Sequence, residues 1–367
     1  MSPDELQKIN LTIADRSNVF YWQTDRDLTP QQAGQIWADR HRYFTDEELT
    51  DKISNHLKDD SIEEIIAFNE DSQTNLGNVN SVRVAKLKSG KEVVIRAHPK
   101  GINNGYFNVE ALASSLAKNI GVPSYETVAV HNFEGNEDFA YHITEKLPGT
   151  ALIKWLEQHP EDEDRLLIEV GRTMANIHQI KVDGFGPFDN EKAKNGILVG
   201  FHETFSDSIS AGLDFNLSVL TEEGIFTDNQ VIAIKNLFDP KNPLLQRESS
   251  VLVHNDFADW NLLTDGKEIT GVLDWDECVG GDPILDLACW STFFDPTRLD
   301  KMLAGYFEGK EKPDDFDRKF QLLRLRFTIS KMTLRIRRFN WEPTEQIKEK
   351  IEIGKKHLEA SLKYFGI

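Results

Sequence analysis

The chain has 367 residues, of which 39% are apolar, and carries a formal net charge of −19 at pH 7. This length and composition allow a large buried core and predict two domains or lobes. The negative charge argues against general nucleic-acid binding, which depends on Lys and Arg to neutralise phosphates, and is weakly compatible with a cationic ligand.

The N-terminus and the cysteines limit the class of protein further. The first ten residues are polar and acidic, and the sequence holds no apolar run long enough to cross a membrane, so we expect neither a signal peptide nor a membrane partner. Cys278 and Cys289 are too few for a disulfide framework and lack metal-ligand spacing. A cytoplasmic protein with reduced thiols is therefore predicted.

The first part of the chain predicts helices. Capping-box patterns, in which Ser or Thr is followed three positions later by Glu or Gln, begin at Thr29, Thr45 and Ser61. We therefore expect residues 1–70 to form a mainly helical N-terminal extension.

Residues 71–148 predict a small lobe of strands. Two β-branched segments flank a turn at 88–91, and a helix over 108–119 ends near Gly121 and Pro123. The expected strands are 81–87, 92–98, 126–132 and 139–147.

Residues 149–367 predict a larger, mostly helical lobe. Within it, a strand-rich island covers 250–275, with a hairpin turn at Asp265 and Gly266. One helix has a buried apolar stripe, formed by Leu167, Val170, Met174 and Ile177. The later helices are expected over 284–294, 296–306, 314–339 and 344–365.

The strand-rich island presents polar side chains from an apolar frame. Asp256 and Asn261 follow the apolar run 251–253, and Asp274 ends an apolar strand where a buried side chain is expected. Mg²⁺ binds few protein oxygens together with nucleotide phosphates and water, so the Asn261 amide and the Asp274 carboxylate are a suitable pair of ligands. Asp256 would then accept the proton of an attacking hydroxyl, as phosphoryl transfer requires.

This pattern resembles a known family. His-x-Asp-x-x-x-x-Asn, beginning at His254 and followed by Asp274, is similar to the catalytic loop and metal-binding segment of aminoglycoside phosphotransferases and choline kinases. The runs 281–283 (Gly-Asp-Pro) and 286–288 (Asp-Leu-Ala) match the family's continuation, and 184–188 resembles the hygromycin-type branch. The resemblance implies an α+β, two-lobed protein-kinase-like fold with a small β-sheet lobe, one main helix in it, and a larger mostly helical lobe.

The resemblance also implies a nucleotide site between the lobes. Arg96 matches the phosphate-binding cation that leaves the third strand, a position that is Lys in many members, and Glu110 matches its partner on the helix. An Arg there would grip phosphate through a fork of donors rather than as a point charge. Mg²⁺ and ATP or GTP are the implied cofactors.

Two further segments of the small lobe resemble nucleotide-contacting parts of the family. Ser81 lies in the segment 77–82, which resembles the loop that covers the nucleotide. The segment 143–149 resembles the hinge, where backbone groups of Glu145 and Leu147 would bind a purine edge. The resemblance therefore implies that Ser81, Glu145 and Leu147 bind the nucleotide.

Other polar residues of the motif have structural explanations. We expect His254 to hydrogen-bond the backbone of its own loop rather than to act in catalysis. Asp282 and Asp286 open a helix, so capping and the helix dipole account for them.

Two charged groups have open assignments. An acidic trio beside the predicted metal ligands is equally compatible with facing a polycationic substrate and with solvation: Asp259, Asp276 and Glu277. The helix 314–339 also has a basic face, which we expect to be solvated although it would suit an anion or a partner: Arg324, Lys331, Arg335 and Arg338.

The predicted function is a small-molecule kinase that transfers the γ-phosphate of ATP or GTP to a hydroxyl of an acceptor. An aminoglycoside antibiotic, a cationic acceptor, is slightly favoured, and the alternatives are choline, an amino alcohol or a sugar. A catalytically silent kinase-like binding protein is a weaker alternative, because all three chemical residues are present. The segment Asp274–Asp286 also contains two carboxylate motifs like those of one class of phosphatase. In such phosphatases a domain's length of chain separates the two motifs, whereas here they lie almost adjacent, so we do not favour this function.

Overall fold

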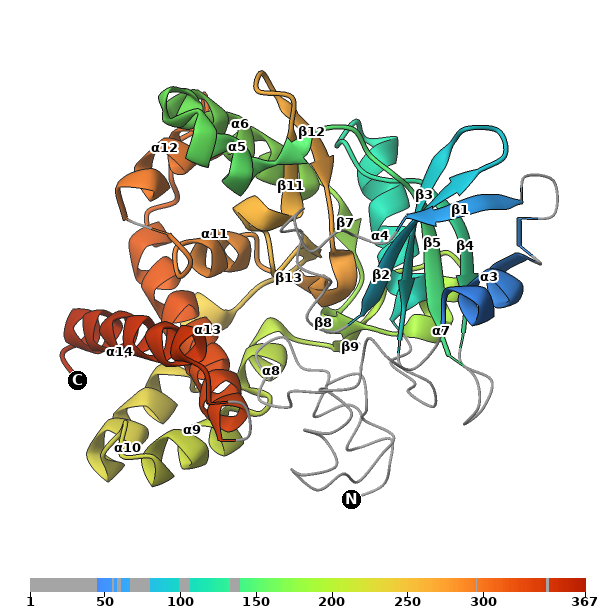
Figure 1. Cartoon of the computed structure of the whole chain (residues 1–367). Helices are drawn as coiled ribbons and strands as arrows, with labels where there is room; N and C mark the ends of the chain where they lie inside the picture. Colours follow the sequence, from blue (N-terminus) through green and yellow to red (C-terminus); the bar gives the residue numbers. More distant parts are fainter. Residues whose placement is uncertain are drawn as a thin grey trace.

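The computed structural model describes residues 45–54, 56–57, 61–66, 80–98, 106–132, 139–294, 296–340 and 343–367. The capping box predicted at Thr29 and the residues 77–79 of the predicted covering loop lie outside these ranges. Within them the chain forms a small antiparallel sheet beside a larger, mostly helical lobe (Figure 1). The predicted α+β, two-lobed fold is confirmed.

The small sheet has the strand order β1-β2-β3-β5-β4, and every neighbouring pair is antiparallel. Its strands are β1 (Ile62–Ile66), β2 (Ser81–Leu87), β3 (Glu92–Ala97), β4 (Thr127–His131) and β5 (Tyr141–Glu145). The predicted β2–β3 hairpin is confirmed, with Gly90 at φ 85° in the turn, where a side chain would be strained. Its register sets Arg96 opposite Val82 and, on the other side, opposite His142.

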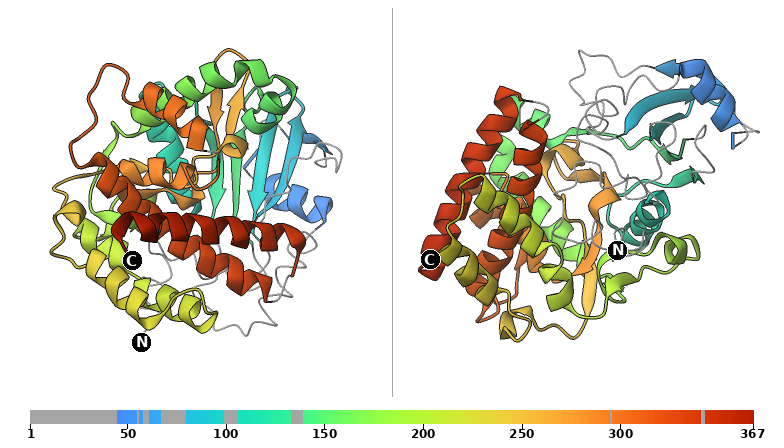
Figure 2. Two further views of the ribbon diagram at one scale, coloured as in Figure 1. Left: turned by 90° about the vertical axis from the view of Figure 1, so that its left-hand side faces the viewer. Right: turned by 90° about the horizontal axis from the view of Figure 1, so that it is seen from below.

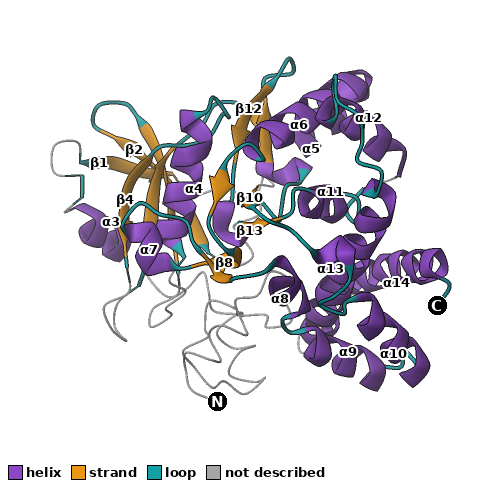
Figure 3. Cartoon of the chain, turned by 180° about the vertical axis from the view of Figure 1, so that it is seen from behind, coloured by secondary structure: helices purple, strands orange, loops and turns teal. Residues whose placement is uncertain are grey.

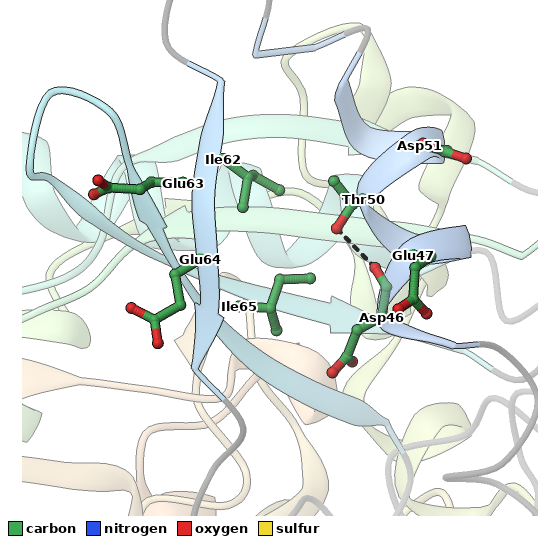
Figure 4. Close-up of a pocket in the computed structure, with 8 residues that line it drawn as sticks. All are labelled: Asp46, Glu47, Thr50, Asp51, Ile62, Glu63, Glu64 and Ile65. Atoms are coloured by element: carbon green, nitrogen blue, oxygen red, sulfur yellow. Dashed lines mark hydrogen bonds between the residues drawn. The ribbon is translucent and has the colours of Figure 1, made fainter.

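Helix α3 (Asp46–Ser54) covers the sheet face away from the helical lobe (Figures 1 and 3). The capping box predicted at Thr45 is confirmed, because the Glu48 N–H donates to the Thr45 hydroxyl at 3.2 Å and the Thr45 N–H donates to the Glu48 carboxylate at 2.9 Å. Leu49 and Ile53 are buried against the sheet. A shallow acidic hollow between α3 and β1 (Figure 4) is lined by Asp46, Glu47, Thr50, Asp51, Ile62, Glu63, Glu64 and Ile65.

The prediction of a helix from the capping box at Ser61 is wrong, because this segment forms strand β1. Ile65 pairs with Ala85 of β2 and packs onto the small core, and Glu63 forms an ion pair with Lys86 at 3.1 Å. A capping box stabilises a helix only weakly, so pairing with a strand about twenty positions away outweighs it.

Helix α4 (Phe107–Asn119) joins the small sheet to the helical lobe. Its buried residues Val109, Ala113 and Ala117 belong to the same core as the helices of the large lobe. The indole N–H of Trp275 also donates to the Ser124 hydroxyl, which follows α4, at 3.0 Å. Because α4 is anchored in this way, the direction of Glu110 from its first turn is set by the large lobe.

The helical lobe contains the predicted later helices and buries the predicted apolar stripe of α6. Its helices are α5 (Leu152–Gln158), α6 (Glu163–Ile177), α7 (Asn190–Lys194), α8 (Phe205–Ser210), α9 (Leu213–Glu222), α10 (Asp228–Leu237), α11 (Ile284–Trp290), α12 (Pro296–Tyr306), α13 (Phe316–Phe339) and α14 (Glu345–Phe365). Figure 2 shows α13 and α14 lying along one another at the outer side of the lobe. Over the described residues, no helix combines the length and apolarity that a membrane crossing requires.

Two small sheets inside this lobe carry the strand-rich island, and the prediction of a single island was too simple. One sheet has the order β7-β10-β13-β8-β9 and the other β12-β11-β6. The strands are β6 (Thr150–Ala151), β7 (Lys181–Val182), β8 (Phe185–Phe188), β9 (Gly200–His202), β10 (Ser250–Val253), β11 (Leu262–Thr264), β12 (Ile269–Val272) and β13 (Val279–Gly281). The predicted β11–β12 hairpin is confirmed, and residues 254–261 connect the two sheets.

The predicted solvation of the basic face on α13 is wrong. Arg324 and Arg335 are half-buried against α14: a guanidinium N–H of Arg324 lies 3.0 Å from the His357 ring, and Arg335 donates to the Lys350 carbonyl at 3.0 Å. The periodicity of α13 alone did not reveal that a second long helix packs on this face.

Candidate active site

The connection that follows β10 is held by a buried carboxylate. Asp286, on α11, accepts the backbone N–H groups of His254 at 2.8 Å and Asn255 at 2.6 Å, and the His178 ring lies 2.9 Å from the same carboxylate. Asn255 has φ 64°, a left-handed conformation that is costly for most residues and is tolerated best by Asn and Asp. The connection therefore turns sharply just before Asp256, and Asp286 holds that turn.

Asp256 and Asn261 are held together by hydrogen bonds across this connection. The Asn261 amide donates to the Asp256 carbonyl at 2.9 Å and to the Asp256 carboxylate at 3.0 Å. Asn261 ends the short 3-10 helix η5 (Asp259–Asn261). The Asp256 side chain is 16% exposed. A carboxylate that is fixed by an amide and still reaches solvent is suited to contact a ligand.

Asp274 lies next to this pair at the end of β12. The Leu273 N–H donates to the Asn261 carbonyl at 2.8 Å, and the His254 ring lies 2.9 Å from the Leu273 carbonyl. Asp274 itself has φ 64°, which bends the chain into the 3-10 helix η6 (Trp275–Glu277) and leaves its side chain 38% exposed. His254 thus ties the connection to the residue that follows β12, and its ring also accepts the Asp256 N–H of its own loop at 3.4 Å, in agreement with its predicted structural role.

Arg96 links the small sheet to this part of the large lobe. One guanidinium nitrogen contacts the Glu110 carboxylate of α4, and the other donates to Asp274 at 2.6 Å and lies 3.8 Å from Asp276. Burial lowers the pKa of Arg96, but Asp274, Glu110 and Asp276 outweigh it and keep the pKa well above its usual value. The structure therefore brings together Arg96, Glu110, Asp256, Asn261 and Asp274.

Glu110 is fully buried. Burial raises its pKa to about 7, because desolvation disfavours the carboxylate and Arg96 opposes this only in part. The neighbouring His142 ring, 3.7 Å away, remains neutral because burial and Arg96 lower its pKa to about 3. The charge of the Arg96–Glu110 pair therefore changes near neutral pH.

This raised pKa predicts a dependence of stability on pH. The folded state retains the Glu110 proton above the usual pKa of 4.5, so this contribution to the free energy of unfolding is fully present below pH 4.5 and is lost as the pH rises through about 7. Urea unfolding of the wild type and Glu110→Gln is the measurement. The stability of the wild type relative to the variant should fall as pH rises between about 5 and about 8; parallel pH profiles would contradict this.

The remaining predicted nucleotide contacts lie outside the Arg96–Asp274 network. The Ser81 hydroxyl accepts from Arg83 at 3.2 Å, at the start of β2. The Glu145 N–H donates to the Glu126 carbonyl at 2.9 Å, so a purine edge would meet the Glu145 carbonyl rather than its N–H. Leu147 follows β5, past the point where Val93 pairs with Glu145.

The acidic trio is not solvated, so that expectation for it is wrong. Asp259 is buried and accepts from Arg298 at 2.6 Å. Asp276 lies 3.8 Å from Arg96, and Glu277 lies 3.6 Å from Lys331, with little exposure of either side chain. Each acid is opposed by a cation from another segment of the chain.

Sequence reasoning missed the role of Asp286 and the position of Lys331. Asp282 does accept the Ile284 N–H at 2.9 Å at the start of α11, as predicted, but the Asp286 carboxylate binds the connection after β10 instead. Lys331, on α13, lies 3.8 Å from the Asp256 carboxylate. The match of residues 286–288 (Asp-Leu-Ala) to the family's pattern was a signal for Asp286. No local feature of the sequence related Lys331 to Asp256.

The two-lobed fold, with a polar site where the lobes meet, defines a phosphotransferase of the protein-kinase-like class. The chain belongs to the phosphotransferase enzyme family, whose model matches residues 76–320. No curated protein sequence matches it significantly.

Several solved structures share the fold at low identity. One is a thermostable mutant of aminoglycoside phosphotransferase APH(4)-Ia in a ternary complex with AMP-PNP and hygromycin B (19% identity, TM-score 0.60, covering 86% of this chain and 98% of that one). Another is a putative fructosamine-3-kinase from Thermobifida fusca (16%, 0.60, 87% and 100%). A third is a choline/ethanolamine kinase family protein from Mesorhizobium loti (17%, 0.54, 78% and 86%).

Proposed function

We propose that the protein is a small-molecule kinase that transfers the γ-phosphate of ATP or GTP to a hydroxyl of an acceptor. The observation that carries this proposal is the network joining Arg96 and Glu110 of the small lobe to Asp274, Asn261 and Asp256 of the large lobe. It is supported by the family membership and by related structures described with AMP-PNP and with GDP. We further propose residues 71–148 and 149–367 as the two lobes, after an extension over 1–70 whose helix α3 and strand β1 pack with the small sheet.

The nucleotide would lie between the lobes. Arg96 would present a charged fork to the phosphates from the position in which Glu110 and Asp274 hold it. Ser81, Glu145 and Leu147 would contact the nucleotide on the small-lobe side, with the Glu145 carbonyl and the Leu147 N–H matching the donor and acceptor of a purine edge. Binding of both ends would fix the γ-phosphate near Asp256.

Asn261 and Asp274 fit a Mg²⁺ ion. The Asn261 amide N–H groups point at Asp256, which directs the carbonyl oxygen of that amide elsewhere, and the Asp274 carboxylate is partly exposed one residue beyond the Leu273–Asn261 hydrogen bond. One carboxylate and one amide carbonyl are the hard oxygen ligands that Mg²⁺ takes along with phosphates and water. When bound, the ion would supply neutralisation of the phosphate charge.

Asp256 would align the acceptor and take its proton. The acceptor oxygen forms a new bond to the γ-phosphorus, the bond from that phosphorus to the bridging oxygen breaks, the hydroxyl proton passes to the Asp256 carboxylate, and the nucleoside diphosphate leaves. Asn261 keeps the carboxylate oriented through its two hydrogen bonds. Catalysis then consists mostly of positioning and charge neutralisation.

The assignment of Asp274 predicts a changed requirement for metal. Removing a ligand should raise the Mg²⁺ concentration needed for half-maximal AMP-PNP binding by about 10-fold or more in Asp274→Ala. Calorimetric titration with Mg²⁺ is the measurement, and Asp300→Ala, which removes the same charge from an exposed position on α12, is the matched control. An unchanged Mg²⁺ dependence in Asp274→Ala would remove Asp274 from the metal site.

The acceptor is tested by a γ-phosphate transfer assay. The panel holds aminoglycosides, choline, amino alcohols and sugars, each with ATP and with GTP, so that the aminoglycoside and metabolic alternatives compete directly. Transfer to one class identifies it. Silence across every acceptor, with nucleotide bound, would support a kinase-like binding protein instead.

A further inference from the structure

One cation links the two chain segments that carry the proposed base and the proposed metal ligand. The Lys331 ammonium of α13 lies 3.8 Å from Oδ1 of Asp256 and 3.6 Å from Oε2 of Glu277. Glu277 ends the 3-10 helix η6, which begins directly after Asp274. Two segments that are separate in the chain, the connection after β10 and η6, therefore meet at one ammonium group.

These three charged groups lie largely out of water. The side chains are 12% exposed for Lys331, 16% for Asp256 and 9% for Glu277. Ion pairs on an open surface contribute little to stability because water and salt screen them, whereas shielded pairs are screened much less. Both carboxylates face the same ammonium, which offsets their mutual repulsion. The charge of Lys331 therefore influences the position that the Asp256 carboxylate adopts.

Two aromatic rings fix the position of the ammonium. It lies 5.2 Å from the ring centroid of Phe327 and 5.9 Å from that of Phe293, distances at which a cation is attracted to the face of a ring. Phe327 is buried four positions before Lys331 on α13, and Phe293 follows the end of α11. The two rings pack edge-on, with centroids 6.1 Å apart. The position of the charge is therefore set by α11 and α13 together.

The two oxygens of the Asp256 carboxylate have different neighbours. Oδ2 accepts the Asn261 amide at 3.0 Å, whereas Oδ1 faces Lys331. The 3.8 Å between Oδ1 and the ammonium exceeds the length of a hydrogen bond, so Lys331 attracts Oδ1 through its charge and does not occupy the lone pair that an acceptor hydroxyl would need. Asn261 and Lys331 thus act on different oxygens, and together they fix the orientation of the carboxylate plane.

We propose that Lys331 is a positioning residue for Asp256, which turns Oδ1 of the carboxylate toward the acceptor hydroxyl and sets its distance from the metal-binding segment. The proposal rests on the proposed function, in which Asp256 takes the proton of the acceptor. Lys331 acts through Asp256 rather than on the nucleotide. Its loss should therefore slow the transfer step, while nucleotide binding by Arg96 and Asp274 is retained.

The test compares variants of the full chain that remove or keep the charge. Lys331→Met removes the ammonium and keeps an unbranched side chain, and Lys331→Arg keeps the charge. The matched control is Lys319→Met, which removes a buried cation from the same helix, where Lys319 contacts Asp282 at 3.2 Å. The rate of γ-phosphate transfer from ATP with Mg²⁺ is measured with the best acceptor of the panel and with water, which needs no identified acceptor. The affinity for AMP-PNP is measured by calorimetry.

The same substitution in an Asp256→Asn background separates a positioning role from a structural one. If Lys331 acts through the Asp256 carboxylate, its removal should matter little once that carboxylate is gone. If Lys331 only supports the fold, Lys331→Met should lower the rate by the same factor in both backgrounds. The comparison therefore gives a result that loss of stability alone would not produce.

We expect Lys331→Met to lower the transfer rate by about 10-fold or more in the otherwise wild-type chain, and by less than about 3-fold in the Asp256→Asn background. Lys331→Arg and Lys319→Met should stay within about 3-fold of the wild-type rate, and AMP-PNP affinity should stay within about 3-fold in every variant. If Lys331→Met does not fold, Lys331→Gln, which keeps a polar group beside the two carboxylates, takes its place with the same expected loss.

Three results would overturn the positioning role of Lys331. They are an unchanged rate in Lys331→Met, the same fold-loss in both backgrounds, and a loss in Lys331→Arg as large as in Lys331→Met. Failure of the proposed function looks different. In that case the wild type binds AMP-PNP but transfers phosphate neither to an acceptor nor to water, or Asp256→Asn transfers as fast as the wild type, and the inference falls with the function.

Discussion

Asp256→Asn is expected to lower the rate of phosphoryl transfer by roughly 10²- to 10⁴-fold, the range that a positioned general base supplies. The substituted side chain has nearly the same shape and its carbonyl oxygen can still accept from Asn261, which now donates to the carboxylate at 3.0 Å. It cannot take the acceptor's proton. The measurement is kcat with the best acceptor of the panel, together with the affinity for AMP-PNP.

The affinity for nucleotide separates loss of chemistry from loss of the site. AMP-PNP should bind Asp256→Asn within about 3-fold of wild type, because Arg96 and Asp274 are untouched. Asp300→Asn, an exposed substitution of the same kind on α12, is the matched control and should leave kcat unchanged. Undiminished transfer by Asp256→Asn would rule out Asp256 as the base.

Asp286→Asn is expected to lower the free energy of unfolding by roughly 3 kcal/mol and also to lower kcat. The fully buried carboxylate accepts the N–H groups of His254 and Asn255 and contacts the His178 ring. In the Asn variant the NH₂ group of the amide would replace one carboxylate oxygen and would face an N–H donor instead of accepting from it. Since these contacts hold the turn before Asp256, its carboxylate would lose its position. Urea unfolding and kcat measured below the unfolding temperature give the two quantities.

Asp282→Asn is the matched control for this effect. Asp282 is buried on the same segment and contacts Lys319 at 3.2 Å and Arg247 at 3.3 Å, away from the Asp256 connection. It should lose a comparable amount of stability while kcat of the folded protein stays near that of the wild type. If Asp286→Asn likewise retained kcat when folded, Asp286 would be structural only and not a positioning residue.

The spacing of residues along the sequence predicted the three polar residues of the large lobe, and the resemblance to the family implied the α+β fold. Asp256 and Asn261 lie in one short connection, Asp274 ends the adjoining hairpin, and each is flanked by apolar strands, so their spacing already implies proximity. Arg96 and Glu110 were placed only through resemblance to the family, because 178 positions separate Arg96 from its partner Asp274. The structure brings these residues together; their roles stay predictions.

The expectations that were wrong share one cause, which is that each was drawn from the local pattern of a segment whose partner lies elsewhere. The Ser61 segment has a helix-start pattern but pairs with β2, and the basic face of α13 has the pattern of a solvated face but is covered by α14. Asp286 has the position of a helix-opening acid but binds the backbone 31 and 32 positions earlier in the chain. Local propensity contributes about 1 kcal/mol in such cases, and tertiary contacts outweigh it.

Residue order along the chain was enough to establish the family-like loop Asp256–Asn261, the strand end at Asp274 and the class of reaction, because those groups are held by short, contiguous backbone. The electrostatic surroundings of Asp256 were decided by folding in three dimensions. Electrostatic forces act through space, so the net charge of −19 said nothing of the site, where Lys331 of α13 lies 3.8 Å from the Asp256 carboxylate. Local order indicated phosphoryl transfer, and packing decided which charged groups surround Asp256.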